Sequence, residues 1–429
     1  MPTTPTSSSP WLDDERKIDA PPPGTRLLVL SDQYLSFVKD QVELLAPHFS
    51  QVTVIVRHNP VTEISRVVPV HSLAPYRRDT LVDLRSVPAN VRVLYAPALF
   101  LPYDADNRRQ GDRLLGSVRR VIRSEKIEFD LVHAHFVWPN GHVAVRLGEE
   151  HGVPVVVTAH GYDIYDLPYR DAAWRALIAD TVRKADRVIA VSERTRRCAA
   201  EIAPGVEPVV IPNGYRPDLF RPMDMAGCRE RLGLPPDRRI VLTAGGFVPE
   251  KGQQYLVEAA ADLAAQGLDL CWVLMGMGRL HDELVRRIAR LGLERRFVLP
   301  GWADHAEMPL WMNACDLFAF PSISESFGVV QVEAMACGRP VVATCNGGSE
   351  EIVNDPGVGM LVPPGDATAL AGAIRSALAR DWDDEVIRAH AARYQWQVVI
   401  EVILSVYREV LSGTSLKEHR REPRVRGSG

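Results

Sequence analysis

The sequence lacks the features that mark several classes of protein. Only six cysteines occur in 429 residues and none forms a C-x-x-C pair, which disfavours a zinc site or a disulfide framework and favours a reducing compartment. It contains no run of 18 apolar residues and no secretory signal, so neither a membrane span nor export is expected. Basic residues do not exceed acidic ones (50 against 54, net charge -4), which argues against nucleic acid as a partner. With these classes disfavoured, we expect a soluble cytoplasmic enzyme.

From residue 25 onward, short apolar segments alternate with segments of helix length, in two successive runs. RLLVLS, FDLVHAHF and VPVVVTAHG belong to the first run, and RIVLTAGG, LCWVLMGMG and LFAFPS to the second. Continuous apolar segments of this length are typical of strands buried on both faces of a parallel sheet. The pattern therefore predicts an α/β protein with two doubly wound, Rossmann-like domains facing one another across a cleft. The predicted parts are a disordered leader (1–24), an N-terminal domain (25–210), a C-terminal domain (211–390), a helix (391–412) and a basic flexible tail (413–429).

A glycine-containing loop follows the first strand of the second run. Its sequence, GGFVPEKGQ, begins at Gly245 and carries Lys251 directly before Gly252 and a helical segment. Glycines permit close backbone approach, a helix N-terminus attracts anions, and a lysine can contact phosphate. The loop matches neither a Walker loop nor a dinucleotide fingerprint. A phosphate-binding loop and a plain strand–turn–helix connection both fit it.

Two glutamates eight residues apart follow a later strand of the same run. LFAFPS leads to Glu325, a helix is expected to open near Ser326, and Glu333 would then lie about two turns into that helix. Carboxylates so separated suit the two ends of an extended ligand with a phosphate in its middle, such as a sugar nucleotide. An exposed helical glutamate is the alternative for Glu333.

These segments resemble the retaining glycosyltransferases of family 4, which have the GT-B fold. The resemblance rests on the Glu325–Glu333 spacing, the run EAMACGRPVVAT, the GG-x-x-E-I pattern ending at Ile352, the P-E-K-G loop and the pair Asn213–Gly214. It covers roughly residues 25–412. It implies transfer of a sugar from a nucleoside diphosphate sugar (a UDP-sugar first, GDP-mannose next) to a hydroxyl acceptor, in glycan, polysaccharide or glycolipid biosynthesis.

The resemblance also implies roles for individual residues. Lys251 would contact the donor diphosphate, Glu333 the ribose and Glu325 the transferred sugar, with Phe327 and Gly328 near the phosphates. Further donor-site candidates are Ser326, Gly246, Arg279 and Trp302. Gly246 stands where the family usually has an arginine, so a second cation is missing there, and Arg279 is the candidate substitute. No D-x-D pattern follows a strand, and neither metal nor cofactor is expected.

Histidines end two strands of the first run. His133 and His135 fit either a metal site or a polar strand end whose ring nitrogens bond to the backbone. His160, followed by Asp163, corresponds to a histidine that the family often places near the donor sugar and the acceptor, and we expect it to be catalytic. Ser36 and Phe37, after the first strand, are weaker candidates.

The segment 107–126 is a basic amphipathic helix by its pattern. It fits a helix resting on anionic lipid or an acidic acceptor, and equally an ordinary surface helix that packs its apolar stripe on the sheet.

Two alternatives to the transferase remain at this point: a non-catalytic sugar-nucleotide-binding protein, and a phosphorylase or epimerase of the same fold. Oligomeric state is left open.

Overall fold

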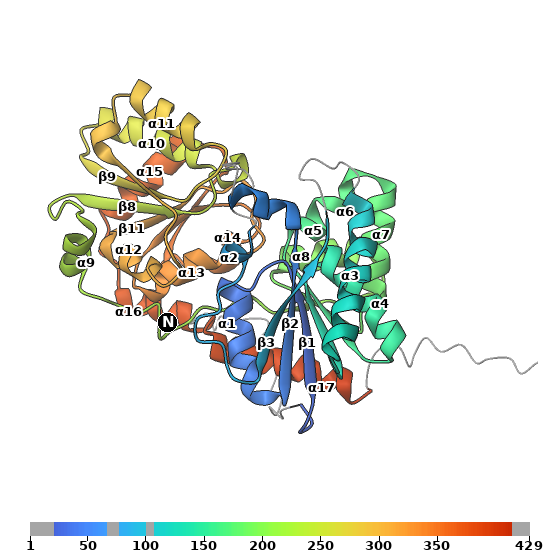
Figure 1. Ribbon diagram of the computed structural model, residues 1–429. Coiled ribbons are helices and arrows are strands. Elements are labelled where there is room, and N and C mark those ends of the chain that lie inside the picture. The colour runs from blue at the N-terminus through green and yellow to red at the C-terminus, as the bar shows by residue number, and fades with distance from the viewer. Residues whose placement is uncertain (1–20, 67–76, 100–106, 414–429) are drawn as a thin grey trace, which may run out of the picture. The chain divides into compact units, whose positions relative to one another are not determined.

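The computed structural model describes residues 21–66, 77–99 and 107–413. Within them the chain forms two compact units (Figure 1). The first comprises residues up to Pro212 together with those from Val399 onward, and the second runs from Asn213 to Val398. The expected leader and tail lie outside the described residues, apart from 21–24 and 413.

The described part of the first unit is built on a seven-stranded parallel sheet. Its order is β3-β2-β1-β4-β5-β6-β7. The chain starts with the central strand β1, adds β2 and β3 on one side of it, and then adds β4 to β7 on the other side. The strands are β1 (Arg26–Ser31), β2 (Gln51–His58), β3 (Val91–Pro97), β4 (Leu131–His135), β5 (Val155–Ala159), β6 (Arg187–Ala190) and β7 (Val209–Val210). The helices are α1 (Ser36–Leu45), α2 (Arg78–Leu81), α3 (Gln110–Glu125), α4 (His142–His151), α5 (Tyr162–Tyr165), α6 (Leu167–Arg170), α7 (Ala172–Lys184), α8 (Glu193–Ile202) and most of α17 (Trp396–Leu411).

The second unit repeats this topology with a six-stranded parallel sheet of order β10-β9-β8-β11-β12-β13. Its strands are β8 (Arg239–Ala244), β9 (Leu270–Met275), β10 (Phe297–Gly301), β11 (Leu317–Phe320), β12 (Val341–Thr344) and β13 (Gly359–Val362). Its helices are α9 (Met225–Leu232), α10 (Gln253–Ala265), α11 (His281–Arg290), α12 (Met308–Ala314), α13 (Val329–Ala336), α14 (Ser349–Ile352), α15 (Ala367–Leu378) and α16 (Asp384–Ala392). The prediction of two Rossmann-like doubly wound domains is confirmed.

Helices cover both faces of each sheet. In the first unit α3, α4 and α7 lie on one face and α1 on the other, and in the second α10, α11 and α15 lie opposite α12 and α13 (Figure 1). The central strands are therefore buried on both sides: all six residues of β9 and all five of β5 are buried. This double burial explains why these strands are continuous apolar segments.

The basic amphipathic segment forms α3, whose apolar stripe packs into the core of the first unit. Leu114, Leu115, Val118 and Ile122 are buried there. The guanidinium of Arg119 pairs with Glu150 on the neighbouring helix α4. The stripe thus has the packing expected of an ordinary surface helix.

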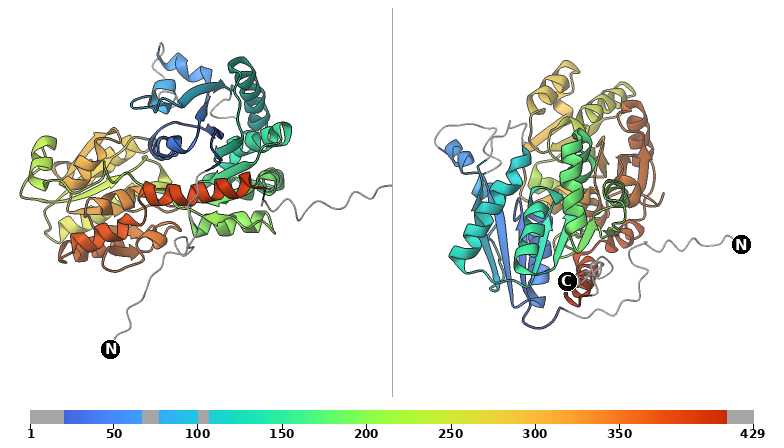
Figure 2. Two further views of the ribbon diagram at one scale, coloured as in Figure 1. Left: turned by 90° about the horizontal axis from the view of Figure 1, so that it is seen from below. Right: turned by 90° about the vertical axis from the view of Figure 1, so that its right-hand side faces the viewer.

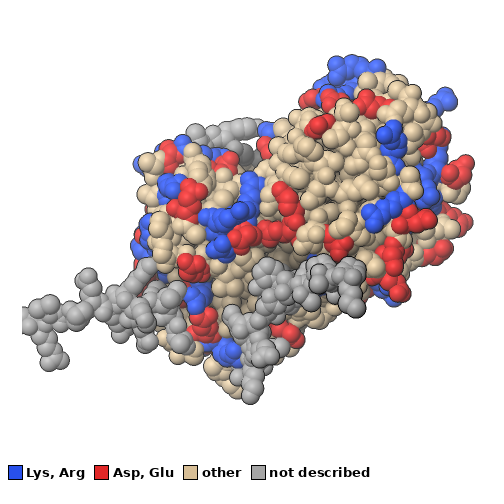
Figure 3. Space-filling view, turned by 180° about the vertical axis from the view of Figure 1, so that it is seen from behind, with Lys and Arg blue, Asp and Glu red and all other residues tan. Residues whose placement is uncertain are grey.

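The last described helix, α17, is a single long helix, drawn in red in Figure 2. Its first three residues belong to the second unit and the rest to the first. No helix in the described part of the chain is long and apolar enough to cross a bilayer. On the described surface seen in Figure 3, acidic and basic side chains are interspersed.

Candidate functional site

The donor-site candidates gather near the boundary between β8 and β11 in the second sheet. Strands are added outward from β8 on one side of this boundary and outward from β11 on the other, so we call it the reversal point of the sheet. In open parallel sheets this is where loops at the carboxyl ends of neighbouring strands diverge and leave room for a ligand. The loop after β8 carries Lys251, and the loop after β11 carries Glu325. The parallel pairing of these two strands brings the two loops to the same edge of the sheet.

A glycine allows the loop after β8 to pack closely against the loop after β11. A short 3-10 turn, Pro249–Lys251, ends at Gly252, which has φ +69°. A β-carbon at Gly252 would lie 2.0 Å from the carbonyl oxygen of Pro321, a distance that no side chain could occupy. The backbone of Ile323 also donates to the carbonyl of Glu250 at 2.7 Å. Only glycine at this position lets the two loops meet.

Lys251 and Glu325 are in direct contact. The ammonium of Lys251 donates to Oε2 of Glu325, and Oε1 of Glu325 accepts from the backbone N–H of Ser326 at 3.1 Å. The Lys251 side chain is 30% exposed and that of Glu325 14%. Lys251, Glu325 and Ser326 therefore form one charged cluster at this edge.

The helix that carries Glu333 starts later than the sequence suggested. It begins at Val329 rather than near Ser326, because Gly328 has φ +85° and cannot belong to a right-handed helix. Glu333 accordingly lies about one turn into α13 rather than two. It is also 6% exposed, so the alternative of an exposed helical glutamate is wrong. His305 Nε2 lies 3.8 Å from its Oε1, a neighbour that the sequence did not indicate.

The remaining donor-site candidates are spread over the same sheet edge. The backbone at Gly246 has room for a side chain, since a β-carbon there would meet only the carbonyl oxygen of Met277, at 3.9 Å. Arg279 follows β9, is largely exposed and lies 3.8 Å from Glu250. Trp302 follows β10 and is 75% exposed.

Asn346, in the turn after β12, was missed by the sequence analysis. Its Oδ1 accepts from the backbone N–H groups of Gly348 (3.1 Å) and Ser349 (2.9 Å), which fixes the turn. A β-carbon at Gly348 would lie 2.8 Å from the backbone nitrogen of Phe327. The turn therefore packs directly against the Ser326–Phe327 backbone. An asparagine before paired glycines is the sequence signal that could have found it.

In the first unit, the candidate histidines form a buried cluster at the ends of β4 and β5. Nδ1 of His133 lies 2.6 Å from the hydroxyl of Tyr407 on α17, and its Nε2 lies 2.7 Å from Oγ1 of Thr158. Nδ1 of His135 lies 3.0 Å from Nε2 of His160. The expectation that the ring nitrogens bond to backbone at a polar strand end is wrong: both nitrogens of His133 and Nδ1 of His135 bond to side chains, and Nε2 of His135 has no hydrogen-bond partner among the described residues. No group of three or more potential metal ligands occurs in the described ranges.

Burial keeps this cluster uncharged. It lowers the pKa of His135 to about 3, and it lowers the pKa values of His133 and His160 below the usual range for histidine. Nearby, burial raises the pKa of Asp163 to about 6, opposed by the backbone N–H groups of Val137 and Gly161 that donate to its carboxylate. Neutral imidazoles can each donate one hydrogen bond and accept one.

Two aromatic rings enclose His160, which is 8% exposed. The ring centroid of Phe37 lies 4.9 Å away and that of Phe136 4.7 Å away. Phe136 has φ +73°, a strained value for a non-glycine residue and one that is concentrated at functional sites. Phe37, a weaker candidate by sequence, is thus in contact with the main histidine candidate, while Ser36 Oγ accepts only from the adjacent Phe37 N–H.

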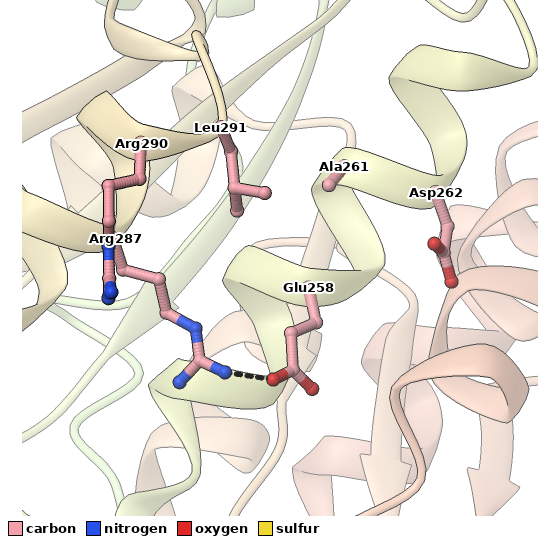
Figure 4. A pocket seen from close by; sticks show the side chains of 6 residues that line it. All are labelled: Glu258, Ala261, Asp262, Arg287, Arg290 and Leu291. Carbon is pink, nitrogen blue, oxygen red and sulfur yellow. Dashed lines mark hydrogen bonds and ion pairs between the residues drawn. The ribbon is translucent and has the colours of Figure 1, made fainter.

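A separate hollow of about 490 Å³ lies between α10 and α11, away from these residues (Figure 4). It is lined in part by Arg287 and Glu258, which form an ion pair. None of the candidate residues named above lines it.

The chain is similar to known glycosyltransferases. Residues 37–219 match the model of Glycosyltransferase Family 4, and residues 227–394 match that of glycosyl transferases group 1. D-inositol 3-phosphate glycosyltransferase 1 of Catenulispora acidiphila is 32% identical over 332 residues, which cover 70% of this chain and 77% of that protein. The D-inositol 3-phosphate glycosyltransferase of Mycobacterium tuberculosis (strain ATCC 25177 / H37Ra) is 32% identical over 326 residues, 70% of this chain and 67% of the relative.

Solved structures of similar fold include sucrose-phosphate synthase from Thermosynechococcus elongatus, with a TM-score of 0.73, 23% identity and coverage of 90% of this chain and 100% of that one. Anabaena HepE in complex with UDP has a TM-score of 0.68 and 23% identity, over 89% and 99% of the two chains. The two parallel sheets, together with the similar sequences and structures, define this chain as a GT-B glycosyltransferase. The chain belongs to glycosyltransferase family 4.

Proposed function

We propose that this enzyme transfers a sugar from a nucleoside diphosphate sugar to a hydroxyl acceptor with retention of anomeric configuration. The contact between Lys251 and Glu325 at the reversal point of the second sheet carries the proposal. An ammonium and a carboxylate held side by side supply a partner for a phosphate and a partner for sugar hydroxyls. A ligand with a diphosphate next to a sugar needs both.

The leaving group is a nucleoside diphosphate, on which negative charge develops as the glycosidic bond breaks. Lys251 and the backbone N–H groups of Phe327 and Gly328 would stabilise that charge. Glu333, buried on α13, would accept from the ribose hydroxyls. Lys251 takes the role of the cation, so we expect turnover to persist in EDTA.

Retention is proposed without a carboxylate nucleophile. Glu325 is engaged by the Lys251 ammonium and the Ser326 N–H, and these contacts reduce the nucleophilicity of its oxygens. We therefore propose a front-side reaction through an oxocarbenium-like state, with Glu325 holding hydroxyls of the transferred sugar and His160 placed near the sugar and the acceptor.

A UDP-sugar is the first donor to test and GDP-mannose the next. The complexes of Anabaena HepE with UDP and with UDP-glucose support UDP, although that likeness is one of fold. The names of the relatives that are 32% identical suggest a phosphorylated polyol, inositol 3-phosphate, as the first acceptor to test. An enzyme with such a donor and acceptor would act in glycan, polysaccharide or glycolipid biosynthesis.

Gly246 favours a second candidate, a non-catalytic protein that binds a sugar nucleotide. The experiment measures binding of UDP-, GDP- and ADP-sugars by calorimetry and then turnover with hydroxyl acceptors, with the anomer of the product read by NMR. Lys251→Ala and Glu333→Ala should each reduce kcat/KM about 10- to 100-fold, the range for loss of a hydrogen bond to a charged group. Lys184→Ala is the matched control, because Lys184 pairs with Asp180 on α7 in the other unit.

Each outcome separates the candidates. Binding without turnover supports the non-catalytic protein, while a product formed without acceptor, or only with inorganic phosphate, indicates an epimerase or a phosphorylase. An inverted product would contradict the front-side mechanism. If no sugar nucleotide binds and neither variant differs from Lys184→Ala, the proposal is wrong.

A further inference from the structure

The hydrogen bond between His135 and His160 determines which nitrogen of His160 carries a hydrogen. Nδ1 of His135 and Nε2 of His160 are 3.0 Å apart, and both rings are neutral because they are buried. A neutral imidazole has one N–H and one bare nitrogen. One of the two facing nitrogens must therefore carry the hydrogen and the other must be bare.

Two arrangements satisfy this condition. In the first, His135 donates from Nδ1, so its own Nε2 is bare and His160 carries its hydrogen on Nδ1. In the second, His160 donates from Nε2, so its Nδ1 is bare and His135 carries its hydrogen on Nε2.

The surroundings of His135 distinguish these arrangements. His135 is fully buried, and its Nε2 has no hydrogen-bond partner among the described residues. The second arrangement would leave an N–H donor buried without an acceptor, whereas the first leaves only a bare nitrogen there. Buried N–H groups without a partner are the rarer of the two in folded proteins.

We propose that His135 is a positioning residue that holds His160 in the tautomer with its hydrogen on Nδ1. His160 then presents an N–H donor, and its remaining nitrogen is occupied by His135. It would donate to an oxygen of the ligand, such as a sugar hydroxyl, and would not act as a proton-accepting base. This inference rests on the proposed function only in placing a ligand beside His160.

The orientation of the His160 ring is fixed from other sides as well. His135 stacks on it with centroids 5.2 Å apart, and the rings of Phe37 and Phe136 lie within 5 Å. The His160 ring has no other hydrogen bond within the described part of the chain. Its Nδ1 is thus available, in one orientation, to a ligand.

His133 provides the matched control. It lies on the same strand, two residues before His135, and is equally buried. Both of its ring nitrogens have partners of their own, Tyr407 and Thr158, and neither bonds to His160. Its replacement should affect folding but not the tautomer of His160.

The direct test is NMR of the whole protein labelled with ¹⁵N-histidine, with the His160 signals assigned by their loss in His160→Phe. Long-range proton–nitrogen correlations distinguish a nitrogen that carries hydrogen from a bare one. We expect the hydrogen on Nδ1 of His160 and on Nδ1 of His135. A hydrogen on Nε2 of His160 would overturn the proposal, whether or not the enzyme turns over any donor.

Variants extend the test to activity. His135→Leu removes the hydrogen-bond donor to His160, and we expect mixed tautomers at His160 and a decrease in kcat of about 10-fold, near the upper end of the effect of losing one hydrogen bond between neutral groups. His135→Asn places an amide N–H near the former Nδ1 and should restore both the tautomer and most of kcat. His133→Asn, measured per folded molecule, should leave both unchanged. An unaltered His160 tautomer in His135→Leu would contradict the role given to His135, while donor binding in the same protein tests the proposed function separately.

Discussion

Lys251 on the loop after β8 and Glu325 on the loop after β11 form an ion pair between positions 74 residues apart in the sequence. The pair holds the ammonium at the reversal point of the second sheet. A diphosphate that binds there would share or displace the carboxylate. Net attraction for an anion is therefore smaller than a free lysine would give, and a second cation nearby should matter.

Gly246→Arg should supply that second cation. The backbone has space for a β-carbon at this position, and the family usually has arginine here. We expect the donor to bind about tenfold more tightly, a gain of about 1.4 kcal/mol, as measured by calorimetry with the preferred sugar nucleotide. Gly246→Gln controls for the added side chain without charge. Equal affinity in the arginine and glutamine variants would show that the site does not need a second cation.

Gly252→Ala should destabilise the second unit more than an ordinary glycine replacement does. The added methyl group must overcome both the positive φ and the approach of 2.0 Å to the carbonyl of Pro321. Gly267 has a similar φ (+84°), and a β-carbon added there would have no atom within 4 Å, so Gly267→Ala should cost only about 1–2 kcal/mol. We expect Gly252→Ala to cost about 2 kcal/mol more than that in urea unfolding. Equal costs would mean that the two loops separate readily.

Glu333→Gln should weaken donor binding while leaving the fold intact. Loss of a charged acceptor for ribose hydroxyls corresponds to about 1.5–3 kcal/mol, or roughly 10- to 100-fold in Kd. His305→Gln should have a smaller effect, because its Nε2 is 3.8 Å from the carboxylate. Glu258→Gln, which alters the ion pair in the hollow of Figure 4, is the control and should not change Kd. A binding loss equal to that in Glu258→Gln would remove Glu333 from the donor site.

The first unit should lose stability in mild acid. His133, His135 and His160 have lowered pKa values, so they stay neutral in the folded chain while the unfolded chain takes up protons below pH 6.5. Three protons correspond to a loss of up to about 4 kcal/mol per pH unit. Asp163, with its pKa raised to about 6 from 3.8, acts in the opposite sense and offsets about one proton as the pH falls between these values.

Hydrogen exchange of β4 and β5 between pH 7 and 5, corrected for intrinsic rates, measures this effect. His133→Asn should reduce the slope by about 1.4 kcal/mol per pH unit, since one proton fewer is taken up. A stability that stays flat down to pH 5 would show that these histidines are charged in the folded protein.

The architecture and the candidate donor loops could be predicted because they depend on local sequence. β5 and β9 are buried on both faces, so each is apolar throughout, and the glycines of the loop after β8 mark a close backbone approach. The start of α13 was placed three residues too early, because the sequence does not reveal that Gly328 adopts a positive φ.

Contacts between distant elements could not be predicted. The pairing of His135 with His160 depends on the register of β4 and β5, in which His135 lies opposite Thr158. The burial of Glu333 depends on how α13 packs, and the pattern of that helix alone fits an exposed glutamate equally well. Tyr407, the partner of His133, lies 274 residues away, and no periodic pattern connects them.

That last contact has a consequence for biosynthesis. Residues from Val399 onward complete the first unit, and Tyr407 is buried in it beside His133 and Phe49. A ribosome releases α17 only after the whole second unit has been made. The unit that is translated first is therefore the last to acquire its full set of native contacts, and an expressed fragment ending at Pro212 would expose the surface that α17 covers.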